Sequence, residues 1–210
     1  MEKLVLIDGH SILNRAFYGV PNLTNSEGLH TNAVYGFLNI LFKVLDEEKA
    51  DYLAVAFDLK APTFRHKMFD AYKGTRKPMP EELHEQVPLM KEVLTAMGVP
   101  ILTKEGYEAD DILGTIAKRE QKDGYEVTIL SGDRDLLQLS DTHIRICLPK
   151  TSRGTTEVHN YYPEDVIREY DHSRGAMVYQ SPMSIIDLKS DANKGVYNYK
   201  YRDIDGQTKA

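Results

Sequence analysis

The sequence predicts an α/β protein with a mainly parallel central sheet flanked by helices. Short apolar runs alternate along the chain with longer segments whose apolar residues have helical spacing. Several of the apolar runs end in aspartate, which is typical of a buried strand followed by a turn. Strand–helix–strand units of this kind are right-handed and build a parallel sheet with helices on both faces.

The individual elements follow from these patterns. Residues 31–49 carry apolar side chains at helical spacing, and further helices are expected over 82–97 and 109–122. Residues 59–83 are basic and aromatic and are interrupted by proline and glycine, so a loop or an irregular helix is expected there. The expected strands are the apolar runs at residues 3–8, 51–58, 125–133 and 143–148, and residues 99–106 are expected to form a strand and a loop.

Composition limits the class of protein. With 210 residues, of which 41% are apolar, the chain can form one good core and a small appendage. Its single cysteine, Cys147, excludes an internal disulfide framework and is typical of a reducing cytoplasm. The first apolar run is too short for a signal peptide, and no stretch is long enough to cross a membrane. We therefore expect a cytoplasmic protein without a membrane partner; the sequence does not indicate an oligomeric state.

The segment "GYEADDILG" places three carboxylates within four residues, Glu108, Asp110 and Asp111. Three of the expected strands end in an aspartate, and parallel strands bring such ends to one edge of the sheet. The helix at 109–122 starts from the same edge, and the segment "SGDRD" adds one more acid. The acids expected at this edge are Asp8, Asp58, Glu108, Asp110, Asp111, Asp133 and Asp135.

Carboxylates this close together raise one another's pKa values unless a cation compensates their charge. Ligand sets made only of oxygen favour hard cations such as Mg²⁺ or Mn²⁺ over zinc. Each motif alone also has a structural interpretation. Asp-Gly is a common turn, an acidic first helical turn is ordinary capping, and Asp135 can simply start a helix. His10 and Cys147 show no ligand spacing and are interpreted as structural.

A basic, aromatic segment follows the second expected strand. Such a segment can be a solvated loop, but basic groups also neutralise phosphates and aromatic rings stack on bases. Because it directly follows Asp58, we expect it to overhang the acidic edge and to bind nucleic acid. Arg15, on the first helix, is a further basic candidate. The nucleic-acid-binding candidates in the segment are Arg65, Tyr72, Lys73, Arg76 and Lys77.

Five segments together resemble the 5′-nuclease domain of bacterial DNA polymerase I, of the flap endonuclease superfamily. They are "LVLIDGHSILNRAFYG", "VAFDLKAPTFRH", "AYKGTRKPMPEEL", "GYEADDILG" and "SGDRDLLQL". The resemblance implies a PIN-like core and cleavage of 5′ ends or 5′ flaps of branched DNA. It also implies two divalent metal ions, Mg²⁺ or Mn²⁺, held by the seven acids named above. Arg15, Lys73 and Arg76 match basic residues near the scissile phosphate, and Tyr72 matches an aromatic residue near the 5′ nucleotide.

The similarity ends after "VIREY". We expect residues 1–170 to form the nuclease core and residues 171–210 to be a divergent, partly disordered tail. In the family this region forms a helix–hairpin–helix unit, which grips the duplex and supplies two more metal-binding aspartates. Without a recognisable copy of this unit, the second metal ion is expected to be weakly held and the activity to be impaired.

Three functions remain open from the sequence. The first is a 5′–3′ exonuclease or flap endonuclease without a polymerase domain, acting on 5′-flap or branched DNA, including an RNA primer strand. The second is a PIN-type nuclease that acts on single-stranded nucleic acid. The third is a truncated, low-activity remnant that binds nucleic acid.

Overall fold

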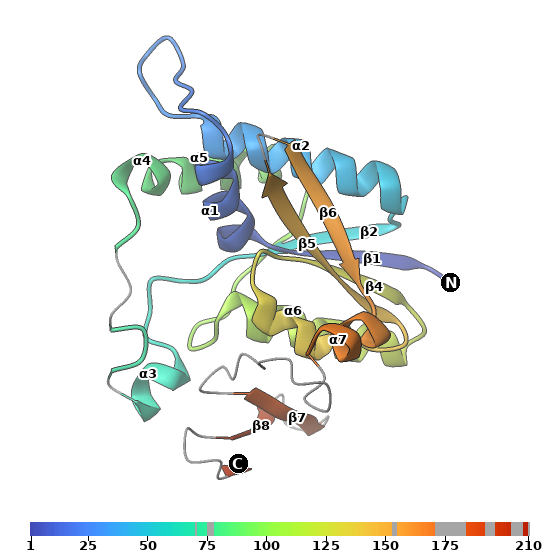
Figure 1. Ribbon diagram of the computed structural model, residues 1–210. Coiled ribbons are helices and arrows are strands. Elements are labelled where there is room, and N and C mark those ends of the chain that lie inside the picture. The colour runs from blue at the N-terminus through green and yellow to red at the C-terminus, as the bar shows by residue number, and fades with distance from the viewer. Residues whose placement is uncertain are drawn as a thin grey trace.

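In the computed structural model a six-stranded sheet forms the centre of the molecule (Figure 1). The structure describes residues 1–69, 71–74, 78–152 and 155–170 and three strands beyond them. The strand order is β3–β2–β1–β4–β5–β6, and every pair is parallel except β5 and β6. The strands are β1 (Lys3–Asp8), β2 (Tyr52–Ala56), β3 (Ile101–Leu102), β4 (Glu126–Leu130), β5 (Ile144–Ser152) and β6 (Thr155–Tyr161).

Helices cover both faces of this sheet. Figure 1 shows α1, α2 and α5 on one side of the strands and α6 and α7 on the other. The helices are α1 (Gly9–Gly19), α2 (Asn32–Glu48), α3 (Phe64–Met68), α4 (Glu81–His84), α5 (Gln86–Ala96), α6 (Ala109–Lys122) and α7 (Pro163–Tyr170), with a 3-10 turn η1 (Arg134–Leu139).

The central strand β1 shows why the sheet is buried on both faces. Val5 and Ile7 pack into the core beneath α1, α2 and α5, whereas Leu4 and Leu6 pack into the core beneath α6 and η1. Successive side chains of a strand point to opposite faces, so a continuous apolar run fills both cores. The expected parallel sheet with helices on both faces is confirmed.

The junction between β1 and α1 fixes the position of the first acid. Asp8 ends the strand and caps the helix, since its carboxylate accepts the backbone N–H of Ser11 at 3.0 Å. Gly9 then lies against the buried ring of Phe57, where a Cβ atom would come within 2.5 Å of the ring. A glycine is therefore required for the first helix to approach the strand that leads to Asp58.

Some elements differ from expectation. The helix expected over 82–97 is two helices, α4 and α5. Segment 59–83, expected to be a loop or an irregular helix, contains the short helix α3, and within 99–106, expected to be a strand and a loop, the strand has two residues. Beyond α7, the strands β7 (Ser184–Asp191), β8 (Val196–Arg202) and β9 (Thr208–Lys209) form a separate antiparallel sheet. None of the helices in the described residues has the length and apolar character needed to cross a bilayer.

Candidate active site

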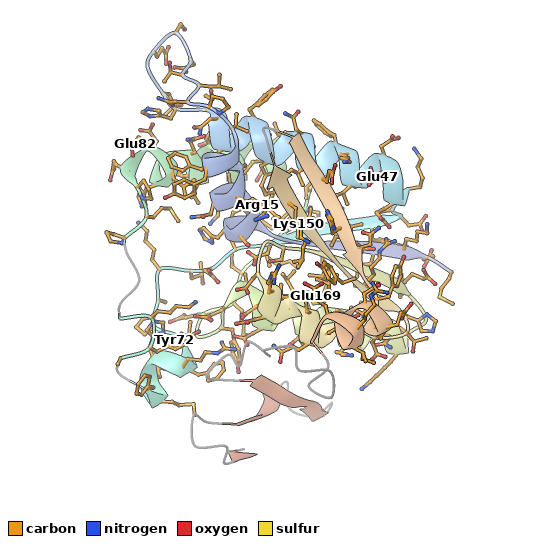
Figure 2. All side chains as sticks on the ribbon, viewed as in Figure 1. Arg15, Glu47, Tyr72, Glu82, Lys150 and Glu169 are labelled. Carbon is orange, nitrogen blue, oxygen red and sulfur yellow. The ribbon has the colours of Figure 1, made fainter. Side chains whose placement is uncertain are left out.

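A cleft of about 1230 Å³ opens beside the carboxyl ends of β1, β2 and β4. In a parallel α/β sheet this is the edge at which ligands bind. The basic residues that line its walls include Arg15 from α1 and Lys73 from the segment between α3 and α4. Figure 2 shows Arg15 on α1 and Tyr72 beside α3, well apart from each other. The five carboxylates that line the cleft are Asp8, Asp58, Glu108, Asp110 and Asp133.

Ser131 joins two of these acids. The hydroxyl of this fully buried residue donates to Asp8 at 3.0 Å and accepts the backbone N–H of Asp133 at 3.0 Å. Burial raises the pKa of Asp8 to about 6, against the lowering effect of its hydrogen bonds to Ser11 and Ser131. Asp58 and Asp133 raise it further through their negative charge. These acids therefore repel one another across the cleft.

Asp58, which follows β2, forms a hydrogen bond to the start of α6. Its carboxylate accepts the backbone N–H of Ala109 at 2.6 Å, at the N-terminal end of that helix. Its own backbone N–H donates to Nδ1 of His10 at 3.2 Å. The imidazole of His10 also contacts the Phe57 ring edge-on, with 5.2 Å between centroids. His10, expected to be only structural, lines the cleft and holds the backbone at Asp58.

Glu108 is bound by the segment that follows α3. Lys73 Nζ lies 2.8 Å from one of its carboxylate oxygens, and the hydroxyl of Tyr72 donates to the other at 3.0 Å. Burial alone would raise the pKa of Glu108, but the ammonium of Lys73 and the guanidinium of Arg65 lower it overall. The Lys73 ammonium is thus the cation that neutralises the Glu108 carboxylate in this structure.

Asp110 and Asp111 are adjacent but have different surroundings. Asp110 lines the cleft, and burial together with the charge of Asp111 raises its pKa to about 7. Asp111 is buried, and its two oxygens accept bonds from the guanidinium of Arg65, both at 2.7 Å. Asp111 also accepts the backbone N–H of Glu108 at 3.0 Å and so caps α6. Asp111 therefore carries a structural ion pair in this arrangement.

The structure thus brings most of the predicted residues to one cleft and leaves others outside it. Asp111 and Arg65 lie beneath the cleft, paired with each other. Asp135 follows Asp133 in the first turn of η1, where its backbone N–H donates to Asp133, and it does not line the cleft. Arg76 and Lys77 lie outside the described residues.

The donor chemistry of the cleft fits a hard divalent cation, because all five of its acids offer oxygen ligands. In the part of the chain that the structure describes, no three Asp, Glu, His or Cys side chains are already grouped closely enough to hold an ion. The acids surround the cleft without converging on a single point, so ion binding would require side-chain rotation.

Comparison with known protein families assigns the chain to one of them. The family described as 5′-3′ exonuclease, N-terminal resolvase-like domain, matches residues 3–171. The chain belongs to this family. DNA polymerase I of Bacillus caldotenax is 47% identical over 188 residues, covering 90% of this chain and 20% of that protein. DNA polymerase I of Bacillus subtilis is 46% identical over the same length and share of each chain. The chain thus spans about a fifth of the length of these relatives.

Solved structures show the same fold. A T5 5′-exonuclease with bound zinc ions matches with a TM-score of 0.61 and 23% identity, covering 81% of this chain and 61% of that one. A T5 flap endonuclease in complex with DNA and metal ions matches with a TM-score of 0.61 and 22% identity, with the same coverage. The predicted PIN-like α/β core of the 5′-3′ exonuclease family is confirmed.

Proposed function

We propose that this chain is a metal-dependent 5′ nuclease that hydrolyses phosphodiester bonds at 5′ ends or 5′ flaps of branched DNA. The observation that carries the proposal is the cleft in which five carboxylates face Arg15 and Lys73. An acidic site that binds cations, bordered by basic side chains, suits a phosphodiester substrate. The family assignment and the DNA polymerase I relatives support the same activity.

The metal ligands in this proposal are Asp8, Asp58, Asp110 and Asp133, with Glu108 joining when Lys73 leaves it. Divalent cations, Mg²⁺ or Mn²⁺, would supply an acidified water and neutralise charge on the phosphate when bound. Two ions are proposed, with the second near Asp133 and Asp135 and more weakly held. The T5 relatives with metal ions in their structures are consistent with metal dependence.

Arg15 is proposed to bind the scissile phosphate. Within the described residues, no group accepts a hydrogen bond from its buried Nε, and no carboxylate pairs with it. Burial without a partner lowers its pKa, because the charged form loses hydration. A phosphate oxygen in the cleft would accept bonds from this guanidinium and offset that loss. Arg76 and Lys77 are proposed to extend these contacts to further phosphates of the substrate. The proposed substrate is branched DNA, whose 5′ strand can also be an RNA primer.

The test of this function compares two substrates of the same sequence, a 5′-flap duplex and an unpaired strand. Each is incubated with Mg²⁺, Mn²⁺ or EDTA, and the labelled products are mapped on a gel. We expect cleavage of the flap duplex at the flap junction or 5′ end in either metal and none in EDTA. Equal cleavage of the unpaired strand would favour a single-strand nuclease, and no cleavage of either would favour a binding remnant.

Lys73→Gln is expected to bind Mn²⁺ more tightly and to cleave flap DNA about 100-fold more slowly. The ammonium now competes with a cation for Glu108, at 2.8 Å, and its removal frees that carboxylate. The same removal takes away a charge that would stabilise the reacting phosphate. Mn²⁺ binding by electron paramagnetic resonance and single-turnover cleavage measure the two effects. Lys67→Gln, on exposed α3 surface outside the cleft, is the control; an unchanged Mn²⁺ affinity in Lys73→Gln would contradict the competition.

We also propose that residues 1–170 are the nuclease core and that residues 171–210 are a separate tail. The six-stranded sheet and the helices packed against it all lie before residue 171. A chain shortened after Tyr170 is therefore expected to keep one cooperative unfolding transition in calorimetry. Loss of that transition in the shortened chain would show that the tail belongs to the core.

A further inference from the structure

Ser131 lies where the two central strands of the sheet end. The parallel register of β1 and β4 pairs Ile7 with Leu130, so the next residue of each strand, Asp8 and Ser131, lie side by side at the carboxyl edge. Ser131 is fully buried, and Asp8 is buried with 8% of its surface exposed. The Ser131 hydroxyl is therefore shielded from water, and its hydrogen bonds are made to protein groups.

This hydroxyl forms one bond as an acceptor and one as a donor. It accepts the backbone N–H of Asp133 at 3.0 Å, which is an ordinary bond within a serine turn. Its single proton goes to Asp8, because a carboxylate can only accept. The donor bond spans 3.0 Å and joins residues 123 positions apart in the chain. A turn alone therefore does not account for it.

Both oxygens of Asp8 are held in this arrangement. Oδ1 accepts the backbone N–H of Ser11 at 3.0 Å, and Oδ2 accepts the Ser131 hydroxyl at 3.0 Å. A carboxylate offers about four lone-pair sites, so each oxygen keeps one for a cation. The two bonds thus fix the rotation of the carboxylate and leave it able to bind a metal ion.

The turn that carries Asp133 is also anchored to α1. The hydroxyl of Ser11 accepts the backbone N–H of Gly132 at 2.9 Å. Gly132 lies against the arginine of the same helix, since a Cβ atom built on it would be 3.8 Å from both Cδ and Nη1 of Arg15. The positions of two acids of the cleft are therefore linked to the position of the proposed phosphate-binding residue.

The carboxylate of Asp133 is less constrained than that of Asp8. Asp133 is exposed, and its Oδ1 accepts the backbone N–H of Asp135 at 2.9 Å. Ser131 holds the backbone of this residue rather than its carboxylate. Since the acids of the cleft have to rotate before they can meet at one ion, the fixed carboxylate of Asp8 defines where they meet.

We propose that Ser131 is a positioning residue of the metal site. Its hydroxyl holds the Asp8 carboxylate in the orientation that binds a divalent cation and sets the spacing between Asp8 and Asp133. The inference rests on the proposed nuclease function and deepens it, since Ser131 acts on the ion only through Asp8. Removal of the hydroxyl leaves every carboxylate in the chain, so metal binding is expected to weaken while the chemical step is largely retained.

The test measures Mn²⁺ affinity without DNA for Ser131→Ala, by electron paramagnetic resonance of the free ion. The variant is expected to bind Mn²⁺ about tenfold more weakly, at the lower end of the effect of removing an outer-shell partner. Single-turnover cleavage of a 5′-flap duplex is measured across a Mn²⁺ titration. Its rate is expected to fall about tenfold below saturation and to return to within about threefold of the wild type at saturation.

A matched pair of variants isolates the hydroxyl from the packing around it. Ser131→Thr keeps the hydroxyl and is expected to bind Mn²⁺ within about threefold of the wild type, whereas Ser131→Val, of the same shape, is expected to bind about tenfold more weakly. Both carry the same added bulk, so their comparison decides the role of the hydroxyl even if Ser131→Ala fails to fold. Urea unfolding verifies the fold of each variant.

Ser140→Ala is the control for loss of a serine hydroxyl. Ser140 is partly buried, lies outside the cleft and donates to the backbone carbonyl of Tyr161 at 3.4 Å. Its removal takes away one hydroxyl and one hydrogen bond without touching an acid of the cleft. The Ser140→Ala variant is therefore expected to keep the wild-type affinity for Mn²⁺.

Two outcomes would overturn the inference. One is a folded Ser131→Ala variant that binds Mn²⁺ with wild-type affinity, which would leave the hydroxyl with a role in the turn alone. The other is equal Mn²⁺ affinity in Ser131→Thr and Ser131→Val. Neither outcome decides the nuclease function, which fails only if the wild-type chain does not cleave the flap substrate in Mg²⁺ or Mn²⁺.

Discussion

Asp110→Asn is expected to reduce metal-dependent cleavage by more than about 100-fold while the chain stays folded. The substitution removes one negative ligand from the cleft, which is a larger loss than the roughly 10- to 100-fold cost of changing an outer-shell partner of a metal. The fold is retained because the amide oxygen can still accept the backbone N–H of Asp111, a bond of 2.8 Å in the present structure. Removing charge beside Glu108 and Asp111 also relieves repulsion at the start of α6.

Single-turnover cleavage of a 5′-flap duplex across a Mg²⁺ titration measures this loss, and urea unfolding verifies the fold. Asp123→Asn is the matched control, since it changes an exposed aspartate at the other end of the same helix. A folded Asp110→Asn variant with wild-type rates at every Mg²⁺ concentration would remove Asp110 from the proposed ligand set.

Asp111→Ala, one residue further on, is expected to lower the free energy of unfolding by about 3–5 kcal/mol. The Arg65 side chain is 8% exposed and that of Asp111 is 1% exposed, and the substitution leaves a buried guanidinium without its main partner. The start of α6 also loses its cap, because Asp111 accepts the backbone N–H of Glu108. Urea denaturation followed by circular dichroism measures the change.

A second variant distinguishes the ion pair from a general sensitivity of this position. Arg65→Met/Asp111→Leu replaces both charges with apolar groups and is expected to recover much of the stability, since no buried charge is left unpaired. If Asp111→Ala proves as stable as the wild type but loses Mn²⁺ binding, Asp111 acts as a metal ligand and its pairing with Arg65 is replaced when the ion binds.

The sequence predicts the core of the fold because each of its strands and helices is marked by an apolar pattern within its own residues. The strand over residues 3–8 and the helix over 109–122 have the expected bounds, since each apolar pattern is interrupted by a turn or a cap. Elements with weaker periodicity were not anticipated. The strand β6 and the helix α7 carry polar, exposed faces, and the antiparallel pairing of β5 with β6 follows from their contact in space.

For the candidate site, the sequence predicts at which edge of the sheet the acidic residues meet. Strand ends that are parallel in space place Asp8, Asp58 and Asp133 together, and the sequence contains that information in the order of its elements. The separate surroundings of Asp110 and Asp111 could not be predicted in this way. Arg65 is 46 residues away from Asp111, and only the folded chain brings the two side chains together. Ser131, which links Asp8 to Asp133, belongs to the motif "SGD", but this motif is equally typical of an ordinary turn. The sequence alone therefore does not predict the linking role.

The position of a bound cation is the most direct test of the proposed metal site. Crystals of the chain soaked in Mn²⁺ and measured near the manganese absorption edge would locate the ion by its anomalous scattering. We expect a peak inside the cleft, contacted by carboxylates from among Asp8, Asp58, Asp110 and Asp133. A map with no peak in the cleft, at a Mn²⁺ concentration that supports cleavage of flap DNA, would contradict the proposed metal site.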